Sequence, residues 1–307
     1  MTLRDALVTA QALPLDRLDA QLLLLHVLAR SVQRATPGEA QGRAWLLAHD
    51  DEALPPEAQQ QFEALTARRA AGEPLAYLTG FKSFYGLDVA VTPAVLIPRP
   101  DTETLVDWAL ATLPPAQAAP RVLDLGTGSG AIALALKQAL RHSHPQAVVW
   151  ATDYSQTALQ IATANALRLG LDITFRHSNW LRDLPKMRDV RDERELSHVS
   201  NPGGQPPGFD LIVSNPPYIT EGDAHLPTLR HEPISALTAG ADGLADLRQI
   251  IAQAPAHLYA GGWLLLEHGF EQASAVRELL TLAGFASVQS KRDLNGIERC
   301  SGGRFLG

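Results

Sequence analysis

A short apolar strand, a glycine loop and a helix-forming run follow one another directly in residues 121–140. The loop contains Gly126, Gly128 and Gly130, and the run after it begins at residue 131. Glycine lets a backbone approach a ligand closely, and the N-terminus of a helix carries unpaired N–H groups. This order predicts the nucleotide-binding turn of an open α/β sheet, in which ligands bind at the carboxyl ends of the strands.

Acidic residues stand on both sides of this loop. The next expected strand, residues 147–152, ends in Asp153, whose carboxylate could accept hydrogen bonds from both hydroxyls of a ribose. Asp124 is the residue type expected to tie the turn and to keep a cationic ligand nearby. The glycine spacing alone is weak evidence, because a dinucleotide fingerprint begins in the same way; it does not match a P-loop, so we expect no phosphate site.

A third expected strand, residues 173–177, is followed by Ser178, Asn179 and Trp180. An amide could bind an adenine edge, and an indole could pack on the adenine ring. Taken alone, Trp180 could equally be an ordinary packing residue. A glycine loop, an acid and a polar-aromatic pair at three successive strand ends together favour a nucleoside site.

The sequence Asn215-Pro216-Pro217-Tyr218 follows another apolar run, residues 209–213, and should lie where a buried strand ends. Proline has no N–H, so the segment cannot continue a ladder and its carbonyls remain available as acceptors. The Asn215 oxygen and the Pro216 carbonyl could accept both protons of an amide NH2 group, while the Tyr218 ring packs on its flat face. The alternative is a Pro-Pro turn without chemistry.

These strand ends resemble those of the Rossmann-like class I methyltransferases that use S-adenosylmethionine. A narrower resemblance is carried, in chain order, by residues 96–105, 122–133, 212–219, Glu232-Pro233 with Asp242-Gly243-Leu244, and 264–269. These segments are similar to segments of the protein-glutamine N5-methyltransferases that modify peptide chain release factors, the HemK/PrmC family. The resemblance covers roughly residues 75 to 300.

The resemblance implies in-line transfer of a methyl group from S-adenosyl-L-methionine to the glutamine side-chain amide in the Gly-Gly-Gln motif of release factors. Asn215 and Tyr218 would be catalytic, and with Pro216 and Pro217 they would bind the substrate. The cofactor-binding residues that it implies are Gly126, Thr127, Gly128, Ser129, Gly130, Asp153, Asn179, Trp180 and Asn215. Asn179 stands where an acid is common in this family, which puts cofactor affinity rather than reaction type in question.

Three other functions share some of these features. Relatives of the family methylate a ribosomal-protein glutamine, but the Ile-Pro-Arg-Pro-x-Thr-Glu run at residues 97–103 favours release factors. Adenine-N6 methyltransferases share only the Asn-Pro-Pro-Tyr sequence, and a formal charge of -7 with a pI near 5.8 argues against a broad basic surface for nucleic acid. A cofactor-sensing module without turnover would not need that sequence.

The chain has room for two domains, since it has 307 residues and 46% hydrophobic content. Apolar residues at helical spacing predict a small helical domain over residues 1–72, either a docking module for the protein substrate or a packing support. Aromatic and β-branched residues around a glycine turn predict a β-hairpin linker over residues 73–95. Residues 96–307 should form the methyltransferase domain.

The second half of that domain should complete the sheet. We expect a helix over residues 243–258, a strand over 262–267, a helix over 272–283, and a closing antiparallel pair at 286–291 and 298–305. With the earlier strands these give a seven-stranded α/β sheet with one reversed strand.

Cysteine and histidine usage bounds the remaining chemistry. Cys300 is the only cysteine, which excludes an intramolecular disulfide or a cysteine cluster for zinc and indicates a reducing compartment. His231, Glu267 and His268 lack metal-ligand spacing, so we expect no metal. Because no apolar run resembles a signal peptide or a membrane span, we expect a cytoplasmic protein that contacts no membrane. We also expect a monomer, although no sequence pattern fixes the oligomeric state.

Residues 185–208 interrupt the family pattern with a charged and then Gly/Pro-rich run. The run contains Gly203-Gly204-Gln205, the same tripeptide as the implied substrate motif. The favoured interpretation is a compositional accident in a flexible loop, and the alternative is a tethered pseudo-substrate.

Overall fold

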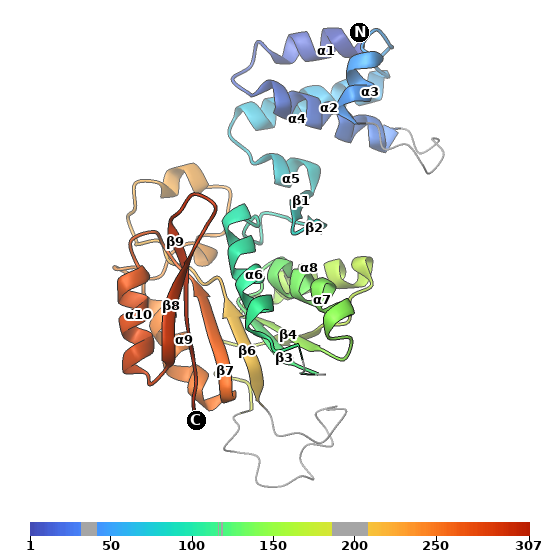
Figure 1. The fold of residues 1–307 in the computed structure, drawn as a ribbon. Coiled ribbons are helices and arrows are strands. Elements are labelled where there is room, and N and C mark those ends of the chain that lie inside the picture. The colour runs from blue at the N-terminus through green and yellow to red at the C-terminus, as the bar shows by residue number, and fades with distance from the viewer. Residues whose placement is uncertain (32–41, 116, 118, 186–207) are drawn as a thin grey trace. The chain divides into compact units, whose positions relative to one another are not determined.

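The computed structural model describes residues 1–31, 42–115, 117, 119–185 and 208–307 (Figure 1). These residues divide into two compact units, Met1–Phe81 and Lys82–Gly307. The tripeptide Gly203-Gly204-Gln205 lies outside the described residues, and the hypothesis that it acts as a pseudo-substrate stays a prediction.

The first unit consists of helices around an apolar core. They are α1 (Leu3–Ala10), α2 (Arg17–Ser31), α3 (Arg43–Ala48), α4 (Pro56–Ala70) and α5 (Leu75–Thr79). Thr2 and Asp5 form a capping box that starts α1. Leucines of α2 pack with Phe62 of α4, and an ion pair of 2.6 Å between Arg69 and Asp19 joins the same two helices.

A two-residue turn joins β1 (Phe81–Phe84) to β2 (Leu87–Ala90) in a two-stranded sheet. The turn residues Tyr85 and Gly86 have φ of 50° and 73°, as a type I′ hairpin turn requires. Glycine adopts this conformation without steric cost, whereas Tyr85 is held by a hydrogen bond of 2.8 Å from its N–H to Glu103. The hairpin expected from the sequence is therefore present.

Within the described residues of the second unit, seven strands form one sheet in the order β5-β4-β3-β6-β7-β9-β8. They are β3 (Arg121–Leu125), β4 (Val148–Asp153), β5 (Thr174–His177), β6 (Phe209–Ser214), β7 (Leu258–Glu267), β8 (Ala286–Arg292) and β9 (Glu298–Arg304). Among these strands only β9 is antiparallel to its neighbours, which confirms the predicted sheet with one reversed strand. The strand order changes direction at β3: β4 lies on one side of it and β6 on the other, and all three strands are parallel. Their carboxyl ends therefore meet at a topological switch point.

Helices cover both faces of the sheet (Figure 1). One face carries α6 (Glu103–Thr112), α7 (Ala131–Ser143) and α8 (Gln156–Leu169), and the other carries α9 (Ala245–Gln253) and α10 (Ala273–Leu282). On β6, Leu211 and Val213 face the apolar core under α6, α7 and α8, and Ile212 faces the core under α9 and α10. A sheet that is buried on both faces requires this alternation. No helix in the described part of the chain is long and apolar enough to span a membrane.

Strand β7 begins at Leu258, earlier than the predicted start at residue 262. Gly261, with φ 90°, lies inside the strand where its pairing with β6 changes register. A glycine inside a strand marks such an irregularity, and the sequence alone does not separate it from a strand start. The helix predicted over residues 243–258 is correspondingly shorter, ending with the 3-10 helix Ala254–Ala256.

One buried side chain, Asn165 on α8, fastens the hairpin strand β2 to α8 and the glycine loop within the second unit. Its oxygen accepts a hydrogen bond of 2.8 Å from the Ala90 N–H, and its NH2 group donates to the carbonyls of Ala90 and Ser129, both at 2.9 Å. Arg168 donates to the same oxygen. The amide of Asn165 thus binds the backbone N–H and carbonyl of β2 at Ala90, as a neighbouring strand would, and it also binds the glycine loop at Ser129.

We expect Asn165→Ala to lower the free energy of unfolding of the second unit by about 2–3 kcal/mol, because it leaves backbone groups at Ala90 and Ser129 without partners. Gln160→Ala, on the exposed side of the same helix, is the matched control and should change stability little. Chemical denaturation measures both variants. Equal stability of the two would show that water takes over these hydrogen bonds.

Candidate active site

A cleft of about 320 Å³ lies at the carboxyl ends of β3, β4, β5 and β6. This volume suits a ligand of nucleoside size. The predicted site residues that line it are Gly126, Thr127, Gly128, Ser129, Asp153, Asn179, Trp180, Asn215 and Pro217. The fold therefore brings together residues that follow the ends of four different strands.

Asp124 holds the glycine loop from inside the sheet. Its Oδ2 accepts hydrogen bonds from the Thr127 hydroxyl at 2.6 Å and from the Ala133 N–H at 3.2 Å, which ties the loop to the first turn of α7. The residue is fully buried, and its Oδ1 has no hydrogen-bond partner among the described residues. Burial raises the pKa of Asp124 to about 7, although its two donors lower it.

Asp153, at the end of β4, holds the loop from its other side. Its Oδ2 accepts from the Gly128 N–H and its Oδ1 from the Ser155 N–H, both at 2.8 Å. Burial raises the pKa of Asp153, while these backbone donors lower it. Each oxygen keeps a second lone pair, so the side chain could also accept hydrogen bonds from a ligand in the cleft.

Trp180 lies against the glycine loop on the side of β5. A Cβ on Gly126 would stand 3.0 Å from its ring, and Gly126 has φ 67°, so this position requires glycine. The indole N–H donates at 3.1 Å to Asp246 of α9, an acid that also lines the cleft and whose pKa is raised by burial. Asn179 is fixed by a hydrogen bond of 2.9 Å from its N–H to Asp183.

The end of β6 is joined to the end of β3 by a buried hydrogen bond of 2.8 Å from the Ser214 hydroxyl to the Leu125 carbonyl. Asn215 follows directly and lines the cleft beside the glycine loop. Its Nδ2 donates to the Thr102 hydroxyl at 3.2 Å. The amide of Asn215 is therefore anchored on its nitrogen side.

Glu267, the last residue of β7, is a buried carboxylate next to Asn215. It is 1% exposed, and its Oε2 has no hydrogen-bond partner in the described part of the chain. Burial raises the pKa of Glu267 to about 7; hydrogen bonds from Thr102 and Asn215 and the charge of Arg299 lower it, and Asp101 raises it. Burial thus moves the titration of Glu267 toward neutral pH.

Three predicted site residues, Gly130, Pro216 and Tyr218, are not among the described residues that line the cleft. Gly130 precedes α7 with φ 88°, and a Cβ there would lie 3.1 Å from the Cβ of Ala162. Pro216 is buried. The Tyr218 carbonyl accepts a hydrogen bond of 3.0 Å from the Gln272 side chain, and burial raises the pKa of its phenol.

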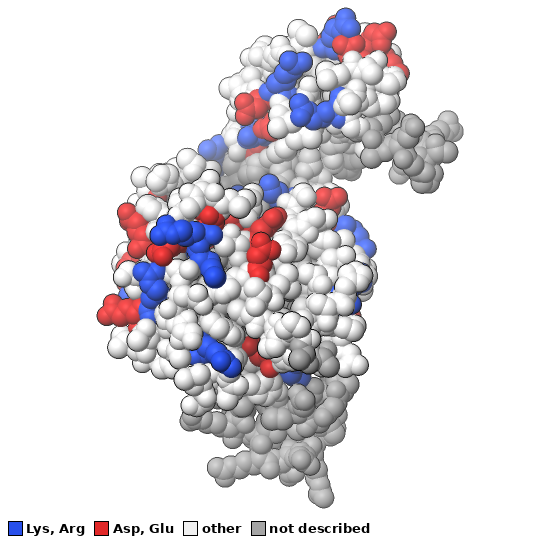
Figure 2. Space-filling view, viewed as in Figure 1, with Lys and Arg blue, Asp and Glu red and all other residues white. Residues whose placement is uncertain are grey.

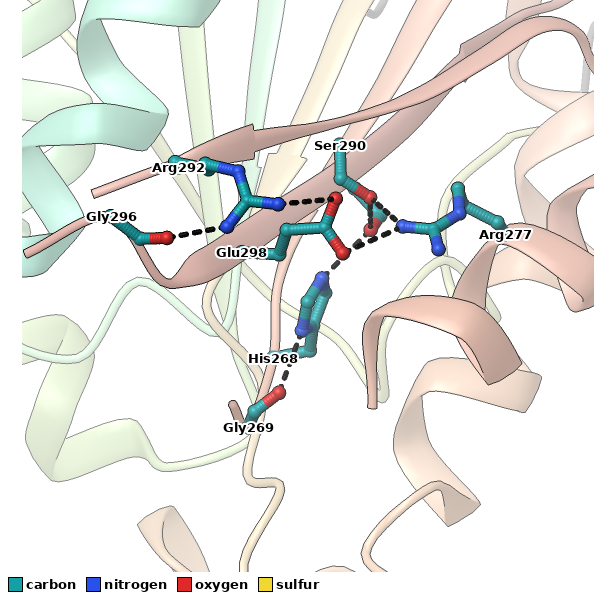
Figure 3. A network of polar contacts seen from close by, with 8 residues as sticks. His268, Gly269, Arg277, Ser290, Arg292, Gly296 and Glu298 are labelled. Carbon is teal, nitrogen blue, oxygen red and sulfur yellow. Dashed lines mark hydrogen bonds and ion pairs between the residues drawn. The ribbon is translucent and has the colours of Figure 1, made fainter. Parts of the chain in front are cut away.

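A chain of polar contacts fixes the turn after β7 (Figure 3). Arg277 donates to Ser290 at 2.5 Å, Ser290 lies 2.7 Å from Ser301, and Ser301 lies 2.7 Å from Nε2 of His268. Nδ1 of His268 donates to the Gly269 carbonyl at 2.9 Å, because a carbonyl can only accept. Burial lowers the pKa of His268, so the ring is neutral and its Nε2 accepts from Ser301. His268 is thus satisfied within the protein.

An ion pair between Arg99 and Glu232 fastens another wall of the cleft. Glu232 is buried and also accepts a hydrogen bond of 3.0 Å from the Ile97 N–H. Arg99 lines the cleft, as do Pro233 and Ser235 beside the acid. The pair therefore holds the segment before α6 against the loop after β6.

The polar lining residues that were not among the predicted site residues include Arg99, Thr102, Ser155 and Asp246. Arg99 and Thr102 belong to the run at residues 97–103, whose place in the family pattern could have pointed to them. Ser155 and Asp246 lie at helix starts, where a polar residue normally indicates a cap. No group of three or more His, Cys, Asp or Glu that could hold a metal occurs in the ranges that the structure describes.

Two family models match the chain: the PrmC N-terminal domain over residues 3–80 and a methyltransferase domain over residues 117–268. Among solved structures, the hMettl16 catalytic domain in complex with the MAT2A 3′UTR hairpin 6 is similar with a TM-score of 0.53 and 15% identity. That similarity covers 79% of this chain and 82% of the other, and it shows the fold alone.

Curated relatives match over almost the whole chain. A release factor glutamine methyltransferase of Bordetella pertussis is 48% identical over 305 residues, which cover 99% of each chain. The protein of the same name from Escherichia coli K12 is 42% identical over 306 residues, which cover 99% of this chain and 97% of the relative. The chain therefore belongs to the release factor glutamine methyltransferase family.

Proposed function

We propose that this protein transfers a methyl group from S-adenosyl-L-methionine to the glutamine side-chain amide in the Gly-Gly-Gln motif of peptide chain release factors. The main support is the cleft in which the glycine loop, Asp153 and Trp180 meet the amide of Asn215. The names of the relatives that match along the whole chain support the same substrate.

The cleft residues fit the adenosine part of this cofactor. A side chain at Gly128 would meet open space, so the loop leaves room for a ligand there. Asp153 keeps acceptor capacity for ribose hydroxyls, Trp180 offers an aromatic ring, and Asn179 offers an amide oxygen for the adenine amino group. When bound, the cofactor supplies a methyl group on a positively charged sulfur.

The chain's own residues would orient the glutamine. An amide nitrogen is a poor nucleophile because its lone pair is delocalised. Two acceptors, the Asn215 oxygen and the Pro216 carbonyl, would bind both N–H groups and return electron density to the nitrogen. Pro217 lines the cleft next to them, and Tyr218 would pack on the amide plane. Holding the nitrogen about 3–3.5 Å from the carbon that it attacks supplies much of the acceleration.

Charge gives little support to a nucleic-acid substrate. On the face shown in Figure 2, basic side chains of the described residues stand among acidic ones and form no continuous basic patch. Methyltransferases of nucleic acid need such a surface for the phosphates.

We expect labelled methyl groups to appear on release factor and not on DNA or ribosomal protein when each is incubated with the enzyme. Labelling of DNA or ribosomal protein instead would contradict the proposal.

Asn215→Ala should lower kcat on release factor by on the order of 100-fold or more, because the amide oxygen acts on substrate orientation in the transition state. The cofactor Kd should change far less. Asn295→Ala, an exposed asparagine of the β8–β9 turn, is the control and should keep full activity. A kcat near that of the wild type in Asn215→Ala would rule out the orientation mechanism.

Asp153→Ala should weaken cofactor binding by about 1.5–3 kcal/mol, the usual scale for hydrogen bonds to a charged group. Titration calorimetry measures this, with the exposed Asp172→Ala as the control. If the Kd of the two variants were equal, the ribose would have to be held elsewhere.

We further propose that the helical unit Met1–Phe81 docks the release factor. A stable protein interface buries about 800 Å² on each partner, and a cleft that accepts one side chain offers far less. The match of residues 3–80 to the PrmC N-terminal domain supports a family-specific role for this unit.

Removing residues 1–81 should leave the cofactor Kd within about twofold and reduce methylation of whole release factor at least about tenfold, because the docking surface is lost. Methylation of a short Gly-Gly-Gln peptide should change little. Circular dichroism confirms that the remaining unit is folded. An equal loss on protein and peptide would assign the helical unit a folding role.

A further inference from the structure

Glu267 is a buried carboxylate to which the proposed function gives no role. It is 1% exposed, its Oε2 has no partner among the described residues, and it accepts hydrogen bonds from Thr102 and Asn215. An ionised carboxylate is costly to bury, and it gains little here for stability. Its position beside the residue that would bind the substrate therefore needs another reason.

The sheet register brings Glu267 to this place. In the parallel pairing of β6 with β7, Ser214 lies opposite Leu266. The next residues, Asn215 and Glu267, therefore stand side by side at the carboxyl edge of the sheet. Thr102, at the start of α6, contacts both of them.

The chemistry of these groups sets the direction of each hydrogen bond. An ionised carboxylate only accepts, so the single hydroxyl proton of Thr102 is donated to Glu267. The Thr102 oxygen is then left as an acceptor. It can accept a hydrogen bond from the NH2 group of Asn215, whereas the Asn215 oxygen has no proton to donate. The oxygen of Asn215 is consequently available toward the cleft.

We propose that Glu267 is a positioning residue that, directly and through the hydroxyl of Thr102, holds the NH2 group of Asn215 and so turns its amide oxygen toward the substrate. The inference rests on the proposed function, because that oxygen matters only if it accepts from the glutamine NH2 group. Protonated Glu267 can instead donate to Thr102, which then donates to Asn215. This reversal presents the NH2 group of Asn215 to the NH2 group of the substrate, and two donors repel.

The activity should therefore depend on the ionisation of Glu267. The titratable groups that face it are Arg299 and Cys300 on β9, Asp101 before α6, and Tyr218 after β6. Burial raises the pKa values of Cys300 and Tyr218, so both stay neutral near pH 7. Since the pKa of Glu267 is about 7, kcat should rise as the pH passes through that value and level off above it.

Asp124 titrates in the same range, since burial also raises its pKa to about 7. It lies in β3 and holds the glycine loop through Thr127, so it should act on cofactor binding. Measuring kcat at saturating cofactor separates the two carboxylates, because only Glu267 should then control the rise.

The test uses the full chain with release factor as substrate, and compares Glu267→Gln, Thr102→Val, Thr102→Ser and the double variant Glu267→Gln/Thr102→Val. Glu267→Gln and Thr102→Val should each lower kcat on the order of 10- to 100-fold, with cofactor Kd within about twofold. Thr102→Ser, which keeps the hydroxyl, should retain most of the activity. Thr112→Val makes the same change at the far end of α6 and serves as the control.

Two readouts distinguish positioning from a structural role. The rise of kcat near pH 7 should vanish in Glu267→Gln. The double variant should lose no more activity than the more impaired single variant, because both residues act on the same amide of Asn215. At pH values above 7, the thermal unfolding midpoint of Glu267→Gln should be no lower than that of the wild type. The folded-state pKa of Glu267 is raised, so the ionised form contributes no stability there.

Activity in Glu267→Gln with an unchanged pH profile overturns the relay, as do additive losses in the double variant. Wild-type enzyme that fails to methylate release factor overturns the proposed function instead. A neutron structure of the wild type above pH 7 tests the relay without any activity: it should show the Thr102 deuteron directed at Glu267 and an Asn215 Nδ2 deuteron directed at Thr102. Reversed deuterons would overturn the inference.

Discussion

The site depends on one buried hydrogen bond, from the Ser214 hydroxyl to the Leu125 carbonyl. Parallel strands separate where their ladder ends, and the backbone beyond has no partner from the sheet. This bond closes the last pair of the β3–β6 ladder at the switch point of the sheet. The glycine loop after Leu125 and the amide of Asn215 therefore start from neighbouring points, and the other contacts of the cleft are arranged around them.

Buried acids, rather than cations, organise the loops that follow. Asp124 and Asp153 each bind two donors from the glycine loop or the adjoining helix start, and Glu232 binds both a backbone N–H and Arg99. A carboxylate suits this task because it accepts several hydrogen bonds at once and donates none when ionised. The cost is desolvation, which appears as the raised pKa values of Asp124 and Asp153.

The sequence alone predicted the features that follow from strand ends. The sheet, its reversed strand and the meeting of the glycine loop with Asn215 all rest on apolar runs followed by a change of residue type. Contacts between distant segments could not be predicted in this way. Asn165 looks like any polar residue of a helix, and nothing in the sequence around Glu267 indicates that it contacts Asn215. The start of β7 was predicted at residue 262 instead of Leu258, because a glycine such as Gly261 can mark either a bulge inside a strand or the boundary of a strand.

The fastening of the hairpin by Asn165 also has a mechanical consequence. The hairpin begins at the boundary between the two compact units, and its second strand is held by the same amide that holds the Ser129 carbonyl. A pull on the chain at that boundary would therefore reach the Ser129 carbonyl of the glycine loop through β2 and the Asn165 side chain.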